Sequence, residues 1–155
     1  MSKPSEATPN STDAYGGDIS SYRVAEQIGH ILRRASQRHA SIFTNRMLDG
    51  LTPTRFAALA MLLERGPLSQ NALGRFTAMD IATIKGVVDR LAGKGLISIN
   101  PDPNDGRRHL IALTELGEKL IREAIPIGLE ISNQTVEKLS SKERVQLLEL
   151  LQKIS

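Results

Sequence analysis

The sequence predicts a mainly α-helical protein that carries one small β-hairpin. Apolar residues recur at helical spacing through most of the chain, and this period gives way to alternation only over residues 96–100 and 108–113. Between these two stretches lie residues 101–106, with the sequence PDPNDG, which is dense in turn-forming residues. We therefore expect two strands joined by a polar turn, with helices before and after them.

Composition and charge exclude several classes of protein. A chain of 155 residues is long enough for one domain with a sizeable core. The absence of cysteine excludes disulfides, thiolate metal sites and thiol redox sensors. We see no signal peptide and no apolar run of membrane-spanning length, and therefore expect a cytoplasmic protein without a membrane partner. The formal net charge of +3 permits nucleic-acid binding without arguing for it.

The N-terminal part divides into a tail and a long helix. Residues 1–18 are rich in Ser, Pro, Asn, Thr and Gly, which predicts a disordered tail. From about residue 20 to residue 48 an apolar stripe predicts a single helix. Its members are Val24, Ile28, Ile31, Leu32, Ala35, Ile42, Phe43 and Met47. Helices of this length usually pack against a partner, so we interpret residues 19–50 as an N-terminal dimerisation helix.

Three shorter helices are predicted next. Thr52-Pro53 supplies a cap and a first-turn proline for one helix, which Gly66-Pro67 ends. Ser69 caps a second helix over residues 70–76. The following turn, residues 77–79, is short enough to set this helix at a steep angle to the next one, as in helix-turn-helix units.

The third of these helices is the predicted recognition helix. Asp80 is a suitable N-cap. A buried stripe follows at helical spacing, formed by Ile84, Val87, Val88 and Leu91. The opposite face carries Ala82, Gly86, Asp89 and Gly93, flanked by Thr83, Lys85 and Arg90. For an isolated helix this would be an ordinary solvated face, so its neighbours decide the interpretation.

The hairpin is the neighbour that favours a DNA-binding role. Gly93 and Gly95 end the helix, and Ile97 and Ile99 are expected on one face of the first strand. Arg107 and Arg108 leave the turn at the tip. From Ser69 to His109 there are six Lys or Arg and four Asp, a net charge of +2. A helix with a free face beside a hairpin with cationic tip residues can contact two grooves of one duplex. We therefore predict a winged helix-turn-helix lobe over residues 51–114.

The C-terminal part, residues 115–155, predicts two dimerisation helices. Thr114 caps a long helix that has acidic residues in its first turn, and Pro126 is expected to kink it. Ser140 and Glu143 have the spacing of a capping box. The last helix is apolar on more than one face, through Val145, Leu147, Leu148, Leu150, Leu151 and Ile154. Such a surface favours association, so we expect a homodimer and hence a pseudo-palindromic operator.

From about Leu51 to Gly117 the sequence resembles the MarR family of bacterial transcription regulators. The fragments that carry the resemblance are DRLAGKGL at residues 89–96, the D-x-R pattern of Asp105 and Arg107, and LTELG at residues 113–117. Their order and spacing together are specific. Two positions depart from the family: Gly86 and Ile99 stand where arginine is common.

The resemblance implies double-stranded operator DNA as a partner. The recognition-helix contacts would come from Ala82, Thr83, Lys85, Gly86, Asp89 and Arg90. Ala82 and Gly86 are suited to contact thymine methyl groups. Lys85 would supply the positive charge that position 86 lacks. The wing contacts would come from Arg107, Arg108 and His109, with Arg107 at the minor groove. Asp105 would orient the wing tip with Arg90 as its partner; the alternative for Asp105 is an ordinary turn aspartate.

The resemblance further implies a small aromatic effector, often a phenolic carboxylate, that lowers DNA affinity. Such a ligand needs an arginine or histidine for its carboxylate and apolar walls for its ring. The candidates are Arg33, Gln37, His39 and Phe56. For His39 the alternative is a histidine satisfied within the core or an interface.

The leading hypothesis is a homodimeric transcription regulator, a repressor released by its effector, that needs no cofactor and no metal. One alternative is a winged-helix module for protein association without a specific DNA target. An enzyme is not expected, because the sequence contains no arrangement like a phosphate loop, an H-E-x-x-H helix or a nucleophile elbow.

Overall fold

The computed structural model describes residues 19–48 and 50–155. The predicted tail, residues 1–18, lies outside the described residues, as does Asp49. The described chain forms two compact units, one up to Ser36 and one from Gln37 to Ser155. Among the described residues, no helix combines the length and the apolar character needed to cross a membrane.

The first helix is shorter than predicted. Two 3-10 turns, η2 (Ile19–Ser21) and η3 (Val24–Glu26), precede α1 (Ile28–Arg46). Gln27 has an extended backbone, which separates η3 from α1. The apolar residues before it, Ile19, Tyr22 and Val24, are exposed. The extended backbone of Gln27 is therefore where the predicted helix is interrupted, and the α-helix begins one residue later.

The remaining helices begin where the sequence predicts. They are α2 (Pro53–Arg65), α3 (Gln70–Phe76), α4 (Ile81–Gly93), α5 (Glu115–Thr135) and α6 (Ser141–Ile154). Each helix is preceded by a residue whose side chain accepts a hydrogen bond from the backbone N–H three residues further on. In chain order these capping residues are Thr52, Ser69, Asp80, Thr114 and Ser140. The capping box of Ser140 and Glu143 is complete. These starts are fixed within one helical turn, and the sequence predictions for them are confirmed.

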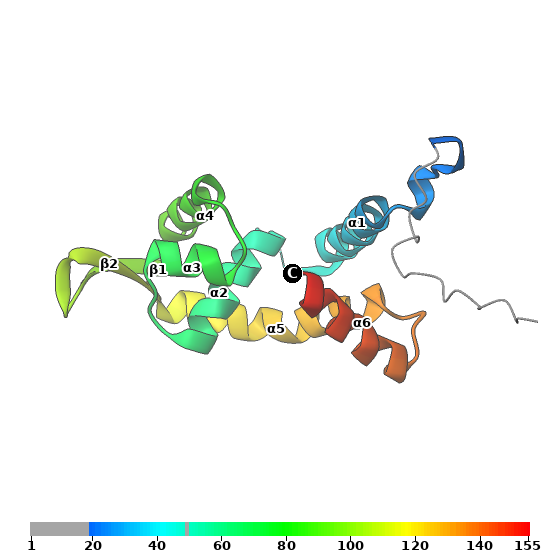
Figure 1. Cartoon of the computed structure of the whole chain (residues 1–155). Coiled ribbons are helices and arrows are strands. Elements are labelled where there is room, and N and C mark those ends of the chain that lie inside the picture. The colour runs from blue at the N-terminus through cyan, green and yellow to red at the C-terminus, as the bar shows by residue number, and fades with distance from the viewer. Residues whose placement is uncertain (1–18, 49) are drawn as a thin grey trace, which may run out of the picture. The chain divides into compact units, whose positions relative to one another are not determined.

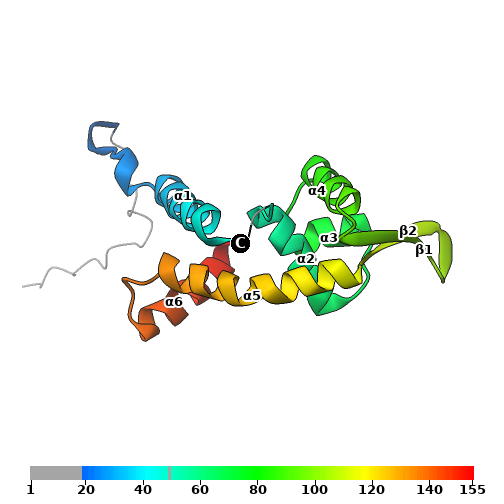
Figure 2. The ribbon, with the colours of Figure 1, turned by 180° about the vertical axis from the view of Figure 1, so that it is seen from behind.

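The core is largely aliphatic, as the scarcity of aromatic residues requires. Its largest fully buried side chains are Leu59, Leu73, Ile84, Val88, Leu91, Ile111, Ile121 and Ile131. They come from α2, α3, α4, α5 and the hairpin, so one core joins the three short helices to the long helix. In Figure 1 and Figure 2 alike, α5 runs alongside α2 and continues to α6.

The hairpin has longer strands and a tighter turn than predicted. Strand β1 (Ile97–Asp102) pairs antiparallel with β2 (Asp105–Leu113), which leaves Pro103 and Asn104 as the turn. Proline has no N–H for the ladder, and the register shifts between Pro101 and Asp102. Both views show the hairpin projecting beyond the helices (Figure 1, Figure 2). The two isoleucines of β1 accordingly differ: Ile97 is buried, whereas Ile99 is 47% exposed.

Two backbone contacts fix the base of the hairpin. Leu68, in the loop between α2 and α3, exchanges both backbone hydrogen bonds with Ile111 of β2, at 3.0 and 2.8 Å. At the other end, the Thr114 hydroxyl donates to the Gly95 carbonyl oxygen at 2.7 Å and accepts from the Gly117 N–H at 3.1 Å. The first turn of α5 therefore lies directly on the turn that joins α4 to β1.

Helix α6 has no buried residue in this chain. Four of its large apolar side chains, Val145, Leu148, Leu150 and Ile154, are 52–67% exposed. A helix that presents this much apolar surface is unfavourable in water unless another surface covers it.

Gly117→Ala should destabilise the fold strongly. A Cβ at this position would overlap the backbone carbonyl oxygen of Leu96, and that group cannot move away without breaking its hydrogen bond from the Thr114 N–H, 3.1 Å long. We expect a loss of about 3 kcal/mol or more in the free energy of unfolding, measured by urea titration. Gly93→Ala is the matched control, because Gly93 is also helical and a Cβ added there would have nothing within 4 Å. That substitution should leave stability unchanged or raised, and equal effects of the two would contradict the assignment.

The cap of α4 should make stability depend on pH. The backbone N–H of Thr83 donates to the Asp80 carboxylate at 2.7 Å and lowers the pKa of Asp80, with a smaller contribution from the Thr83 side chain. A lowered folded-state pKa stabilises the fold above the unfolded-state pKa, about 3.9. The stability difference between wild type and Asp80→Ala should thus be full at neutral pH and shrink as the pH falls through the folded-state pKa. Urea unfolding from about pH 6 to pH 2 measures it. Asp80→Asn keeps a neutral cap and should lack this pH dependence; a difference that grows on acidification would contradict the assignment.

Candidate nucleic-acid interface

Helix α4 is buried on one side and free on the other. The predicted stripe of Ile84, Val87, Val88 and Leu91 is buried. On the opposite side lie Ala82, Thr83, Lys85, Gly86, Asp89 and Arg90, which we call the outer surface of α4. All six are exposed except Gly86, which is half-buried. The structure therefore brings together the six residues predicted for the recognition helix on one uncovered surface.

Gly86 leaves open space in the middle of this surface. A Cβ at Gly86 would meet only Nη1 of Arg90, at 3.9 Å, which is ordinary van der Waals contact. The Arg90 guanidinium thus lies beside Gly86 and along the helix. Because no bulky side chain stands at this position, another surface can approach the backbone of α4 closely.

Ile81 is a candidate contact that the sequence reasoning missed. It is the first residue of α4 and is 78% exposed, although it is a large aliphatic side chain. It borders a hollow between α3 and α4. The hollow is lined by Asn71, Gly74, Arg75, Ala78, Met79, Asp80, Ile81 and Ile84. The wheel gave no signal, because Ile81 stands three residues before Ile84, at the spacing of the buried stripe.

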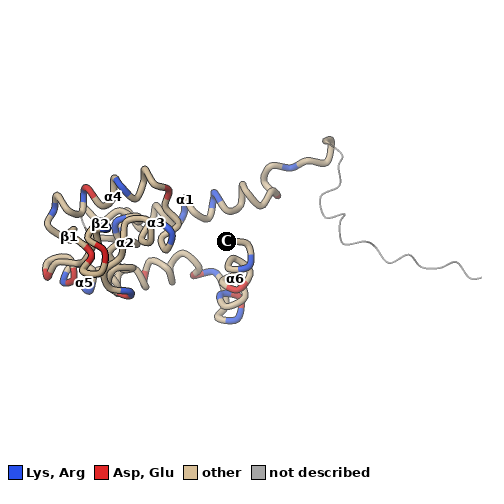
Figure 3. Tube along the Cα trace, turned by 60° about the vertical axis from the view of Figure 1, so that its left-hand side comes forward, with Lys and Arg blue, Asp and Glu red and all other residues tan. Residues whose placement is uncertain are grey.

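The charges of the outer surface are partly paired. Lys85 Nζ lies 2.8 Å from Asp89 Oδ2, one helical turn away. The charged residues of α4 alternate in sign along the helix, as Figure 3 shows. The free positive charge on this surface therefore comes mainly from Arg90.

The hairpin supplies exposed cations at its tip. The Arg107 side chain is 94% exposed, and Arg108 and His109 are exposed as well. Asp105 Oδ1 accepts from the Arg107 backbone N–H at 3.1 Å and lies 3.4 Å from Arg107 Nε. The prediction that Arg90 is the partner of Asp105 was wrong. The Asp105 carboxylate bonds instead to Arg107, two residues away on its own strand, which it reaches more easily than another helix. Asp105 therefore shapes the tip locally.

The residues predicted for an effector site fall into both units. Arg33 belongs to the first unit, where its Nη2 lies 3.3 Å from His30 Nδ1. Gln37, His39 and Phe56 belong to the second unit, and Gln37 is exposed. Within the second unit, Phe43 connects two of them. Its ring lies 6.3 Å from the His39 ring and 5.8 Å, edge-on, from the Phe56 ring.

His39 is oriented by Thr135 of α5, a residue that sequence reasoning missed. The Thr135 hydroxyl donates its proton to the Ile131 carbonyl oxygen at 2.8 Å, so the same oxygen accepts from His39 Nδ1 at 2.9 Å. In the neutral ring with its proton on Nδ1, Nε2 is a hydrogen-bond acceptor. Half-buried His39 is thus held by one nitrogen and keeps the other for a second partner.

Two arginines attach the second half of α1 to the end of α5. Arg38 donates to the carbonyl oxygens of Gln134 and Thr135 at 3.3 and 3.5 Å and pairs with Glu137 at 2.8 Å. Arg46 pairs with Glu130 at 2.7 Å. Cations at the last carbonyls of a helix are favoured by its dipole, so these arginines have a structural role.

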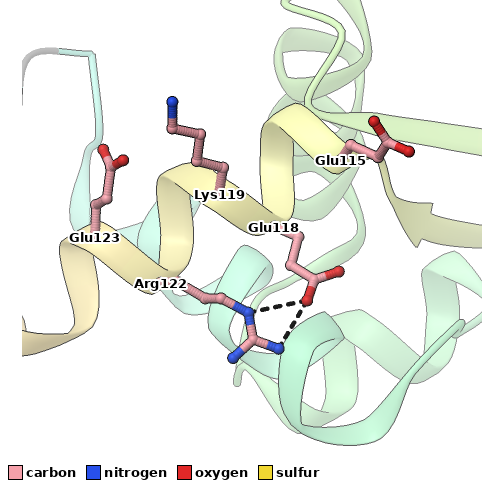
Figure 4. A pocket seen from close by; sticks show the side chains of 5 residues that line it. All are labelled: Glu115, Glu118, Lys119, Arg122 and Glu123. Atoms are coloured by element: carbon pink, nitrogen blue, oxygen red, sulfur yellow. Dashed lines mark hydrogen bonds and ion pairs between the residues drawn. The ribbon is translucent and has the colours of Figure 1, made fainter.

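A charged hollow on α5 offers no comparable site. Figure 4 shows its lining residues, Glu115, Glu118, Lys119, Arg122 and Glu123, all from successive turns of one helix. Arg122 donates twice to Glu118, at 2.9 and 2.7 Å. The five residues are exposed, and no second element supplies a lining residue, so the hollow has no enclosing wall.

Comparison with known proteins matches this geometry. The family model described as "MarR family" matches residues 51–109. The HTH-type transcriptional repressor NicR of Pseudomonas putida is 42% identical over 155 residues, with 99% of this chain and 95% of NicR covered.

Two solved structures have the same fold at substantial identity. A probable transcriptional regulator from Pseudomonas aeruginosa has a TM-score of 0.83 at 48% identity, with 86% of this chain and 100% of that chain covered. BpsR of Bordetella bronchiseptica, whose DNA binding is regulated by 6-hydroxynicotinic acid, has a TM-score of 0.83 at 39% identity, with 86% and 96% covered. The chain belongs to the MarR family of DNA-binding transcriptional regulators and is not an enzyme.

Proposed function

We propose that the protein is a homodimeric repressor that binds a pseudo-palindromic operator and leaves it when a small aromatic acid binds. In this proposal residues 51–114 form the DNA-binding lobe, and residues 19–50 and 115–155 form the dimer. The observation that carries the DNA-binding part is the uncovered outer surface of α4, whose six predicted contact residues lie together opposite the core.

The operator contacts divide between α4 and the hairpin. The outer surface of α4 enters the major groove, where Ala82 and the space at Gly86 suit thymine methyl groups and Lys85 and Arg90 suit guanine or phosphate oxygens. The exposed guanidinium of Arg107 enters or borders the minor groove, where a narrow A·T-rich segment concentrates negative potential. Arg108 and His109 contact phosphates beside it.

The homodimer is supported by apolar surface that this chain leaves uncovered. Helix α6 exposes four large aliphatic side chains and buries none, and the first half of α1 exposes Ile28, Ile31 and Leu32. A second copy of the chain is the partner that carries a matching surface of the same kind. Two-fold symmetry then places two α4 helices on one side of the duplex, which is why the operator would be pseudo-palindromic.

The effector proposal combines a relative with the geometry at His39. BpsR, 39% identical, responds to 6-hydroxynicotinic acid, a hydroxylated aromatic carboxylate. In this chain His39 bonds to Thr135 through Nδ1, its ring lies next to the Phe43 ring, and the Phe43 ring lies next to the Phe56 ring. We propose that a hydroxylated aromatic or pyridine carboxylate binds against His39 and Phe56, with Gln37 as a further candidate from the same unit. Such a ligand acts only if it binds the DNA-free conformation better than the DNA-bound one.

Arg107→Ala should weaken operator binding by about tenfold and reduce its salt dependence. The loss of one groove contact accounts for the lower affinity. Neutralisation of one phosphate fewer makes the slope of log K against log salt shallower by about 0.9. The probe is a duplex selected from the organism's own DNA fragments by the wild-type protein, and fluorescence anisotropy measures binding.

Arg122→Ala provides the control, because Arg122 is an exposed arginine on α5, away from the proposed contacts. It should leave affinity and slope unchanged. Equal effects of the two substitutions would discredit the wing assignment. If no duplex is enriched at all, the alternative of a protein-association module replaces the repressor.

His39→Asn should abolish most of the response to 6-hydroxynicotinic acid while leaving operator binding intact. The asparagine amide can still donate to Thr135 in place of Nδ1, but nothing replaces Nε2. One lost hydrogen bond from the ligand's hydroxyl group to Nε2 should raise the effector concentration for half-release about tenfold. His39→Gln is the paired variant, since its longer amide reaches the place of Nε2 and gives up the Thr135 bond. A normal response in His39→Asn would remove Nε2 from the effector site.

A further inference from the structure

Asp89 is an unexpected residue on a surface that contacts DNA. Its side chain is 59% exposed on the outer surface of α4, among the residues proposed to lie in the major groove. A carboxylate there is repelled by the phosphates on either side of the groove. The buried stripe does not require it, because Asp89 lies on the opposite side of the helix. In this structure the Asp89 carboxylate pairs with Lys85 of the same helix.

The pair of Lys85 and Asp89 is well formed and freely accessible. The distance from Nζ to Oδ2 is 2.8 Å, and the two side chains are 66% and 59% exposed. Lys85 and Asp89 together have no net charge, so Arg90 remains as the unneutralised cation among the six residues.

We infer that Asp89 is a positioning residue that holds the Lys85 ammonium and thereby limits binding to DNA of arbitrary sequence. This inference rests on the proposed function. On an arbitrary duplex, a phosphate must displace Asp89 from Lys85 and also meets the repulsion of the carboxylate. On a matched operator, a base or a phosphate offers an acceptor within reach of the Lys85 ammonium, which then exchanges Asp89 for this acceptor. Exposed pairs one helical turn apart are weak, so the pair opens readily when a better acceptor is in place.

The inference differs from direct reading of a base by Asp89. A carboxylate in the major groove can accept from the N4 amino group of cytosine. In that case Asp89→Asn would change the preference at one base pair and leave DNA of arbitrary sequence unaffected. Under our inference, the same substitution acts chiefly on arbitrary DNA and acts through Lys85.

The experiment compares wild type, Asp89→Asn, Lys85→Met and the double variant, each as the full chain. Two labelled duplexes are used: one selected by the wild-type protein from a random pool, and one with the same composition in scrambled order. Binding is followed by anisotropy between about 50 and 200 mM salt. Asp89→Asn should steepen the salt slope on the scrambled duplex by about 0.9, since Lys85 then neutralises one more phosphate. Across that salt range its affinity should fall about threefold more than that of wild type, and the ratio of selected to scrambled affinity should drop.

Lys85→Met supplies the decisive control. With Lys85 removed, Asp89→Asn should leave the slope on the scrambled duplex unchanged. The same increase in slope without Lys85 would overturn the inference, because a general charge effect would then explain it. A changed preference at one base pair with an unchanged slope would overturn it in favour of direct reading. Failure to select any duplex would refute the proposed function instead, and the salt slopes on a duplex of arbitrary sequence would then still decide the role of Asp89.

Discussion

One-sided burial of α4 is the constraint on which the interface depends. Ile84, Val87, Val88 and Leu91 are at most 3% exposed, and they hold the helix against α3 and β1. Burial of four such side chains contributes roughly 6 to 12 kcal/mol, which is comparable to the whole stability of a typical domain. Turning the helix about its axis would forfeit that energy. The residues that face outward are therefore fixed by those that face inward.

Local signals allowed much of the fold to be predicted from the sequence. Each cap, such as Thr52 or Ser140, satisfies a backbone N–H three residues away, so its effect needs no knowledge of the remaining structure. The first helix was predicted too long because periodicity does not show where the backbone leaves the helical conformation. The apolar spacing continues from Val24 to Ile28, whereas Gln27 between them is extended.

The interface was predictable to the extent that it follows from helical periodicity. The outer surface of α4 comes directly from the wheel, whereas the partner of Asp105 depends on the tip of the hairpin, where the carboxylate binds its own strand. Thr135, which orients His39, lies 96 residues further along the chain, and no local pattern connects the two. Ile81 was missed because it has the spacing of the buried stripe and is nevertheless exposed.

Helix α5 is bonded at both of its ends, so a tilt of this helix would move the hairpin. One end is held to the base of the hairpin through Thr114 and Gly117, and the other end is bound by Arg38, Arg46 and His39 of α1. A helix of 21 residues is about 30 Å long. A tilt of about 5° at the α1 end therefore shifts the hairpin end by about 2.6 Å, about half the width of a minor groove. A displacement beside His39 that tilted α5 would therefore be carried to the base of the hairpin.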